Sequence, residues 1–129
     1  MVWDASNKQL LANFGASSTW TATLTTTATT GITAAGTTQA TATTLTTRLN
    51  VVRTGGAGMG VVLSATMAGQ QIVVNRTGAA LLVYPSTGGL IDDGSTNAAV
   101  TIPAKGSATF ERYPGTASFF TSAQATATQ

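Results

Sequence analysis

The chain has 129 residues, of which 43% are hydrophobic and only 8% are charged, so we expect a packed fold rather than disorder. It contains neither cysteine nor histidine, which excludes disulfides, thiolate metal sites and histidine-based catalysis. The net charge of +2 is too weak to indicate a nucleic-acid partner. We therefore expect no cofactor, no metal ion and no binding to nucleic acid.

The first 17 residues differ in composition from the rest and are predicted to form an N-terminal docking arm. Ser6, Gln9 and Gly15 have the spacing of a capping box and a C-terminal stop, which is typical of a helix of one or two turns. So short a helix is not stable alone, so it must rest on its own domain or on another subunit. The candidate docking residues are the large apolar ones, Trp3, Leu10, Leu11 and Phe14.

Neither a basic leader nor an apolar run of about 20 residues is recognised in the sequence. We therefore expect a chain that is made and used without a secretion signal and does not contact a membrane.

Residues 19–47 contain 16 threonines and no charged residue. Apolar residues alternate with threonine over 19–25, which predicts a half-buried strand. A second strand is predicted over 39–52, with a bulge or a bend near Thr43 and Thr44 because the apolar residues move from even to odd positions there. An ice-binding threonine array would need coils repeated at a fixed period, and two similar segments do not predict a solenoid.

The second half of the chain is predicted to be conventional β structure, beyond a glycine-rich segment at 54–60 that we interpret as a soft internal hinge. Turn residues separate apolar runs about ten residues apart, which is typical of an antiparallel β-sandwich or a small jelly-roll-like barrel. These runs lie at 61–63, 72–74, 81–84, 98–102, 107–112 and 118–121. We therefore expect one all-β domain over 18–122, followed by a tail at 123–129 that has no anchor and frays.

Runs of three or four apolar residues further predict strands that are covered on both faces, either inside the domain or at a subunit interface. Glu111 and Arg112 are adjacent on a predicted strand, so their side chains point to opposite faces. We interpret them as surface charges or as partners across a subunit boundary.

The motifs that bear chemistry are weak. Asp92 and Asp93, the only adjacent carboxylates, precede Gly94 and predict a turn rather than a cation site. The glycines at 55–60 lack the spacing of a phosphate loop. Asn75 begins a glycosylation-type triplet that we interpret as a coincidence. Since only Lys8 and Lys105 could activate a nucleophile and neither lies in a motif, we expect no enzymatic activity.

A series of β-turn motifs follows in a set order from residue 31 to residue 120. They include ITAAGTTQATA at 32–42, LNVV at 49–52, AGQQIVVNRTG at 68–78, LVYP at 82–85, IDDG at 91–94 and AAVTIPAKG at 98–106. In this order the chain resembles a small β module of virion structural proteins of tailed bacteriophages. It departs from the module at Phe119 and Phe120, where a Trp-Tyr strand commonly closes it.

The resemblance implies a virion component, often trimeric. Because the chain is short, it implies a capsid decoration protein, a homotrimer that binds the major capsid protein on the capsid surface and stabilises the head shell. The alternative is a head-fibre or tail-fibre adhesion module that binds glycans of the host surface. Its candidate sugar contacts are Trp20, Tyr84, Tyr113 and the turn at Asp92 and Asp93.

Overall fold

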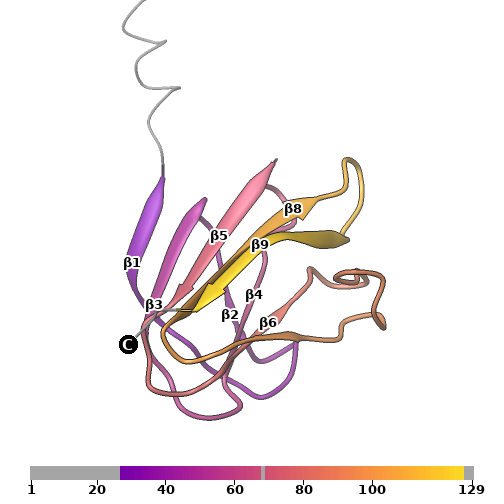
Figure 1. Cartoon of the computed structure of the whole chain (residues 1–129). Helices are drawn as coiled ribbons and strands as arrows, with labels where there is room; N and C mark the ends of the chain where they lie inside the picture. Colours follow the sequence, from indigo (N-terminus) through magenta and orange to yellow (C-terminus); the bar gives the residue numbers. More distant parts are fainter. Residues whose placement is uncertain (1–26, 68, 127–129) are drawn as a thin grey trace, which may run out of the picture.

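Strands make up all the regular secondary structure in the computed structural model, which describes residues 27–67 and 69–126 (Figure 1). They are β1 (Ala28–Thr33), β2 (Thr43–Thr44), β3 (Leu49–Thr54), β4 (Gly60–Val62), β5 (Gln70–Asn75), β6 (Leu81–Tyr84), β7 (Val100–Ile102), β8 (Gly106–Arg112) and β9 (Phe119–Thr126). The predicted all-β class is confirmed for this part of the chain. The predicted helical arm and the predicted strand over 19–25 lie outside the described residues.

The strands form two sheets that enclose one core. The larger sheet has the order β1-β3-β5-β8-β9 and the smaller one the order β2-β4-β6-β7. From β1 to β6 the chain alternates between the two sheets, so that β2, β4 and β6 form a second layer, seen to the right of β1 and β3 in Figure 1. Ala28 pairs with Leu49 and Leu49 with Ile72, so each return to the same sheet takes about 20 residues. The first six strands thus wind as three successive rungs.

The antiparallel pairing predicted from the sequence is wrong for this winding part of the fold. The pairs β1–β3, β3–β5, β2–β4 and β4–β6 are parallel, whereas β5–β8, β6–β7 and β8–β9 are antiparallel. The reason is that each of the first connections crosses to the other sheet, so the chain returns in its original direction. The winding was not predicted either, because these rungs do not need a repeated sequence.

The strand predicted over 39–52 is in fact two strands, because the chain crosses between the sheets at residues 45–48. β2 belongs to the smaller sheet and β3 to the larger one, and Leu45 between them is buried in the core. The Thr47 hydroxyl donates to Asn50 Oδ1 at 2.8 Å, while Asn50 Nδ2 donates to the Thr47 carbonyl at 2.8 Å. The shift of the apolar positions therefore marks a crossover and not a bulge.

An irregularity occurs instead in β1, where the ladder to β3 is not continuous. The register between β1 and β3 shifts between Thr29 and Ile32. There the Arg53 side chain donates through Nε to the Thr30 carbonyl at 3.0 Å. An arginine side chain thus donates to a backbone carbonyl within the irregular part of the ladder.

Each apolar run of the second half overlaps one of the strands β4 to β9, as predicted, although Ala98 and Ala99 precede β7. The glycine-rich segment 54–60 connects β3 to β4, and strands on either side of it pair with each other in both sheets, so the segment lies within one body. β9 continues past the predicted domain end at residue 122, because Ala123 pairs with Thr109 and Thr126 with Gly106. The backbone of residues 123–126 is therefore anchored in the larger sheet rather than forming a free tail.

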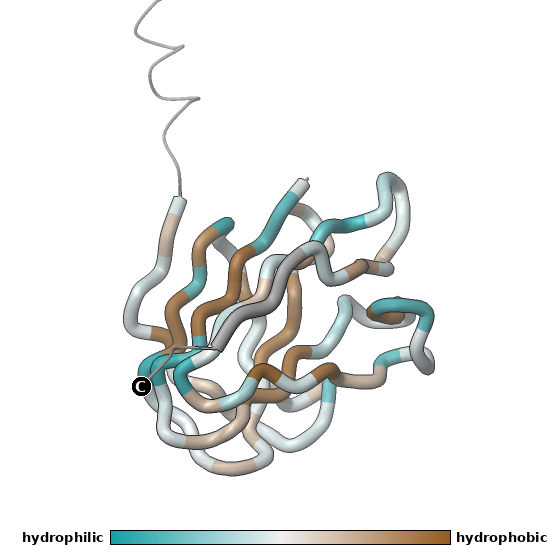
Figure 2. Tube along the Cα trace, viewed as in Figure 1, coloured by the Kyte–Doolittle hydropathy of each residue, from teal (hydrophilic) through white to brown (hydrophobic). Residues whose placement is uncertain are grey.

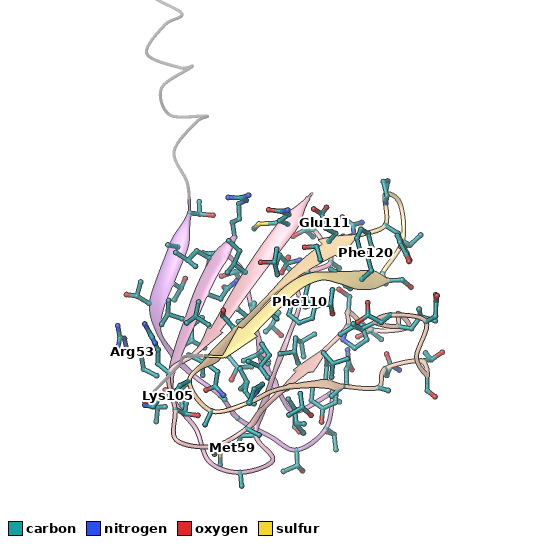
Figure 3. All side chains as sticks on the ribbon, viewed as in Figure 1. Arg53, Met59, Lys105, Phe110, Glu111 and Phe120 are labelled. Carbon is teal, nitrogen blue, oxygen red and sulfur yellow. The ribbon has the colours of Figure 1, made fainter. Side chains whose placement is uncertain are left out.

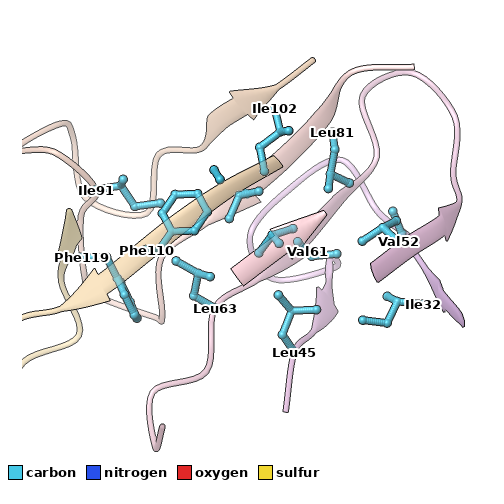
Figure 4. Packing of buried hydrophobic residues seen from close by; sticks show 14 residues of the cluster. Ile32, Leu45, Val52, Val61, Leu63, Leu81, Ile91, Ile102, Phe110 and Phe119 are labelled. Atoms are coloured by element: carbon cyan, nitrogen blue, oxygen red, sulfur yellow. The ribbon is translucent and has the colours of Figure 1, made fainter. Parts of the chain in front are cut away.

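Aliphatic and aromatic side chains from both sheets meet between them in a single cluster (Figure 4). Val52, Val73 and Phe110 come from the larger sheet, and Val61 and Val83 come from the smaller sheet. Each of these five side chains has 0% of its surface exposed. Removal of this apolar area from water is the main driving force for the fold.

Three amide side chains, Asn50, Gln71 and Asn75, are also fully buried among the apolar residues of the larger sheet. Gln71 accepts from the Ser64 amide at 2.8 Å and donates to the Ser64 carbonyl at 3.0 Å. The Gln71 side chain thus pairs with the backbone of the connection between β4 and β5 as a neighbouring strand would. Buried polar groups of this kind are stable only because hydrogen bonds replace their contacts with water.

Candidate interaction surface

The outer face of the larger sheet is unexpectedly apolar. Leu49, Val51, Ile72 and Val74 are half-buried and alternate with fully buried residues along β3 and β5. None of them belongs to the core cluster, so they project from the opposite face of the sheet. Leu49 lies beside Ile72 and Val51 beside Val74, which makes these four residues one contiguous outer patch. A sheet face that stays in water usually carries polar side chains instead.

Small residues border the outer patch on its two sides. Thr109 pairs with Ile72 and Ser107 with Val74 on the side of β8, and Ala28 pairs with Leu49 on the side of β1. No charged side chain interrupts the pairs that run from β1 across to β8 at these two levels.

A row of polar side chains closes one end of the outer patch. Arg48 donates through a terminal guanidinium nitrogen to Gln70 Oε1 at 3.3 Å, and Gln70 Nε2 donates to Glu111 Oε2 at 2.7 Å. Figure 2 shows these hydrophilic positions at the same end of β3, β5 and β8, beyond the hydrophobic middle of the strands. The row sets a positive charge on the β3 side and a negative charge on the β8 side, with a neutral amide between them.

Two exposed aromatic rings extend this row beyond Glu111. Phe120 pairs with Glu111 across β8 and β9, so the two side chains share the outer face (Figure 3). The Phe120 ring lies 5.3 Å from that of Tyr113, at an interplanar angle of 31°. The two residues are 36% and 37% exposed, so they present apolar area to the solvent.

Asp92 and Asp93 form a turn, as predicted. Both have a positive φ, 52° and 59°, and the Gly94 amide donates to the Ile91 carbonyl at 2.9 Å. The Asp92 carboxylate accepts from the amide and from the hydroxyl of Thr121, both at 2.7 Å. Asp92 therefore anchors the turn to β9, next to Phe120.

Replacement of Asp92 by alanine is expected to lower the free energy of unfolding by about 1–2 kcal/mol. Both bonds to Thr121 are lost, and alanine is strained at this positive φ. Asp93→Ala is the matched control, since it introduces the same strain at the adjacent residue and leaves the two Thr121 bonds in place. Urea unfolding measures both variants, and equal losses would show that the hydrogen bonds contribute nothing.

Several residues singled out in the sequence have structural roles. Tyr84 is only 7% exposed and donates its hydroxyl to the Thr37 carbonyl at 3.0 Å, so its ring does not form a sugar platform. Asn75 is fully buried, which excludes it as a glycosylation acceptor in the folded chain. Lys105 donates through Nζ to the Arg76 carbonyl at 3.1 Å.

Glu111 and Arg112 differ in direction, as predicted. Glu111 bonds to Gln70 on the outer face, while Arg112 donates through Nε to the Thr116 carbonyl at 2.7 Å. Arg112 therefore fastens the β8–β9 connection, whereas Glu111 remains at the edge of the outer patch.

The predicted docking residues Trp3, Leu10, Leu11 and Phe14 lie outside the described residues, as do Lys8 and Trp20. Within the described ranges, no three acidic side chains come together in a way that could hold a metal ion. The same ranges contain no helix that is long and apolar enough to cross a membrane.

The outer patch was not among the sites predicted from the sequence. The signal was present in the consecutive apolar residues at 49–52 and 72–74, which predicted strands covered on both faces. What covers the second face could not be derived from that pattern, and neither could the alignment of the two strands.

Comparisons of the chain with family models, with curated proteins and with solved structures found no match.

Proposed function

We propose that the chain is a structural protein of a bacteriophage virion, a homotrimeric decoration protein that binds the major capsid protein and stabilises the head shell. The order of turn motifs from residue 31 to residue 120 supports the phage assignment. The two-sheet β architecture is compatible with the sandwich-like modules of such virion proteins, although fold alone does not define function.

The observation that most favours an assembly component is the larger sheet, which has aliphatic side chains on both faces. One face encloses the core and the other presents the outer patch to the surroundings. Apolar surface that is contiguous and rimmed by polar groups is typical of a protein–protein interface. A protein with this surface acts by being packed against other chains.

The mechanism of such a protein is mechanical. A trimer placed where capsid subunits meet contacts several of them at once, so separation of the subunits must also break its buried contacts. The added contacts resist the outward pressure on the shell. No turnover and no cofactor are required for this action.

Deletion of residues 1–17 is expected to abolish binding to the capsid and to leave the β domain folded. The reason is that this predicted arm contains the candidate apolar anchors, whereas the core cluster found among the described residues begins at Ile32. Co-sedimentation with shells assembled from the major capsid protein measures binding, and circular dichroism measures the fold.

A full-length variant in which Trp3, Leu10, Leu11 and Phe14 are all replaced by serine keeps the length of the arm and should lose binding equally. Unchanged sedimentation of both variants with the shells would overturn the arm as the anchor. A second set of shells that lack the major capsid protein's outer surface loops would separate specific from adventitious pelleting.

The second candidate function is an adhesion module that binds host glycans. The observation in its favour is that Tyr113, Phe120 and the Asp92 turn come together at the start of β9. Aromatic rings stack on the apolar faces of sugars, and carboxylates accept from sugar hydroxyls. A glycan array probed with the protein and with a Tyr113→Ala variant tests this function, which requires a signal that the variant loses.

A further inference from the structure

We infer that the outer patch is where copies of this chain meet, with Arg48 of one copy facing Glu111 of the next. The proposed function calls for a trimer without saying which surface forms it. This inference names the surface, and its test needs no capsid, so the two can fail separately.

First, the two faces of β5, a central strand of the larger sheet, differ in polarity in an unusual way: amides lie on the core side and aliphatic residues lie on the outer side. The inner side of β5 contains the amides Gln71 and Asn75, while its outer side contains Ile72 and Val74. The inner amides are satisfied by hydrogen bonds to the chain itself. The outer aliphatic residues have no corresponding layer of described residues over them, and water is an unfavourable environment for them.

The second step is the arrangement of charge around the patch. Arg48 and Glu111 lie at the same end of the strands but on opposite sides of β5. Two strand spacings separate them, or about 10 Å, so each reaches Gln70 rather than the other. In a single copy these two opposite charges do not pair with each other. In two copies placed side by side, the arginine of one copy can pair with the glutamate of the other.

The third step is geometrical. A rotation axis that runs parallel to the strands keeps each residue at its own level along the strand. When the outer faces are turned toward such an axis, the β3 side of one copy meets the β8 side of the next. Arg48 then faces Glu111 of the neighbour, with two such pairs at the interface about a two-fold axis and one pair at each of the three junctions about a three-fold axis. The same surface serves a two-fold or a three-fold axis.

The aromatic pair fits this arrangement. Phe120 and Tyr113 lie beyond Glu111 on the β9 side, so they approach the β1 side of the neighbour, where Ala28 is small and exposed. Large rings set against small side chains provide apolar contact area at the rim of the aliphatic patch. The occupant that matches the patch in both charge and size is thus another copy of the chain.

The first test is the native mass of the full-length protein, measured by sedimentation equilibrium at micromolar concentrations. We expect two or three times 12.9 kDa, whereas a monomer at all concentrations would overturn the inference. Ile72→Lys, at the centre of the patch, should raise the dissociation constant at least about tenfold. The matched control is Leu82→Lys. Like Ile72, Leu82 is a half-buried aliphatic residue, but it lies on the outer face of the smaller sheet. An equal rise of the dissociation constant in both variants would contradict the assignment of the interface to the outer patch.

The second test uses the charges and keeps the patch itself intact. Arg48→Glu alone places two acids at each junction, and Glu111→Arg alone places two bases there, so each variant by itself should associate at least about tenfold more weakly. When the two purified variants are mixed, the Arg48→Glu copy and the Glu111→Arg copy present opposite charges to each other. Differently tagged forms should then co-purify. If the mixture associated no better than either variant alone, the Arg48–Glu111 pairing would be overturned. Thermal unfolding verifies that each variant is folded.

Discussion

Replacement of Phe110 by alanine is expected to lower the free energy of unfolding by about 3–5 kcal/mol, the largest effect of any single truncation proposed for this chain. Phe110 lies on the inner side of β8 and has 0% of its surface exposed. Figure 4 shows its ring in the core near Leu63 and Ile91, where residues from both sheets meet. The variant loses the transfer free energy of the ring and leaves a cavity that both sheets line.

The matched control is Phe120→Ala, a truncation of the same residue type on the adjacent strand. Phe120 is 36% exposed on the outer face, so its removal from the separated chain should cost less than about 1 kcal/mol. The midpoint of guanidinium unfolding, measured for both variants at one protein concentration, gives the comparison. If Phe110→Ala unfolded no earlier than Phe120→Ala, the core would not lie where the structure places it.

Asn75→Ala is expected to cost about 3 kcal/mol, although it removes only a small polar side chain. Asn75 Nδ2 donates to the carbonyls of Ala79, Ile102 and Pro103 at 2.8, 3.2 and 3.0 Å. Its Oδ1 accepts from the amide and the hydroxyl of Thr77 at 3.0 and 2.8 Å. The substitution leaves several buried donors and acceptors without partners, and each such group is costly in a low-dielectric interior.

Gln70→Ala provides the control for Asn75→Ala, because it removes an amide from the same strand on the opposite face. The partners of Gln70 are Arg48 and Glu111, both of which can turn to water when the amide is lost, so the expected cost is below about 1 kcal/mol. Chemical unfolding of the two variants measures the difference. Similar losses for both would mean that the Asn75 network is not a structural element of the crossovers.

These two buried sites explain how a short, weakly charged chain maintains two sheets. Apolar side chains hold the sheets together, while amides such as Gln71 and Asn75 satisfy the irregular backbone where the chain crosses from one sheet to the other. A crossover that ends buried must place its backbone groups in hydrogen bonds. The fold therefore needs both apolar residues and hydrogen-bonding amides in its successive rungs.

The strand positions of the second half were predictable from sequence because the signals for them are local. The run at 81–84 coincides with β6, and the turn at Asp92 and Asp93 is the one predicted from two acids followed by glycine. A run of β-branched residues between turn formers favours a strand whatever its partner is. The carboxylate turn needed only four neighbouring residues.

The pairing of the strands was not predictable in the same way. Leu45 and Leu49 belong to a single alternating pattern in the sequence, yet one lies in the core and the other on the outer face of the larger sheet. A shift in alternation is compatible with a bulge or with a crossover, since both reverse the face that a side chain occupies. Only the contacts of residues about 20 positions away distinguish the two.

The sequence by itself determined the chemistry that this protein lacks and the segments that become strands. Composition excludes histidine and cysteine chemistry at any position, and turn residues act within a few positions of themselves. The tertiary structure decided that the strands of the first rungs pair in parallel. It also placed amides on the inner face of β5 and Ile72 and Val74 on its outer face, and it brought Arg48 and Glu111 to one end of the outer patch. These features depend on partners far apart in the chain, because the free energy of a strand face is set by what the complete fold places against it.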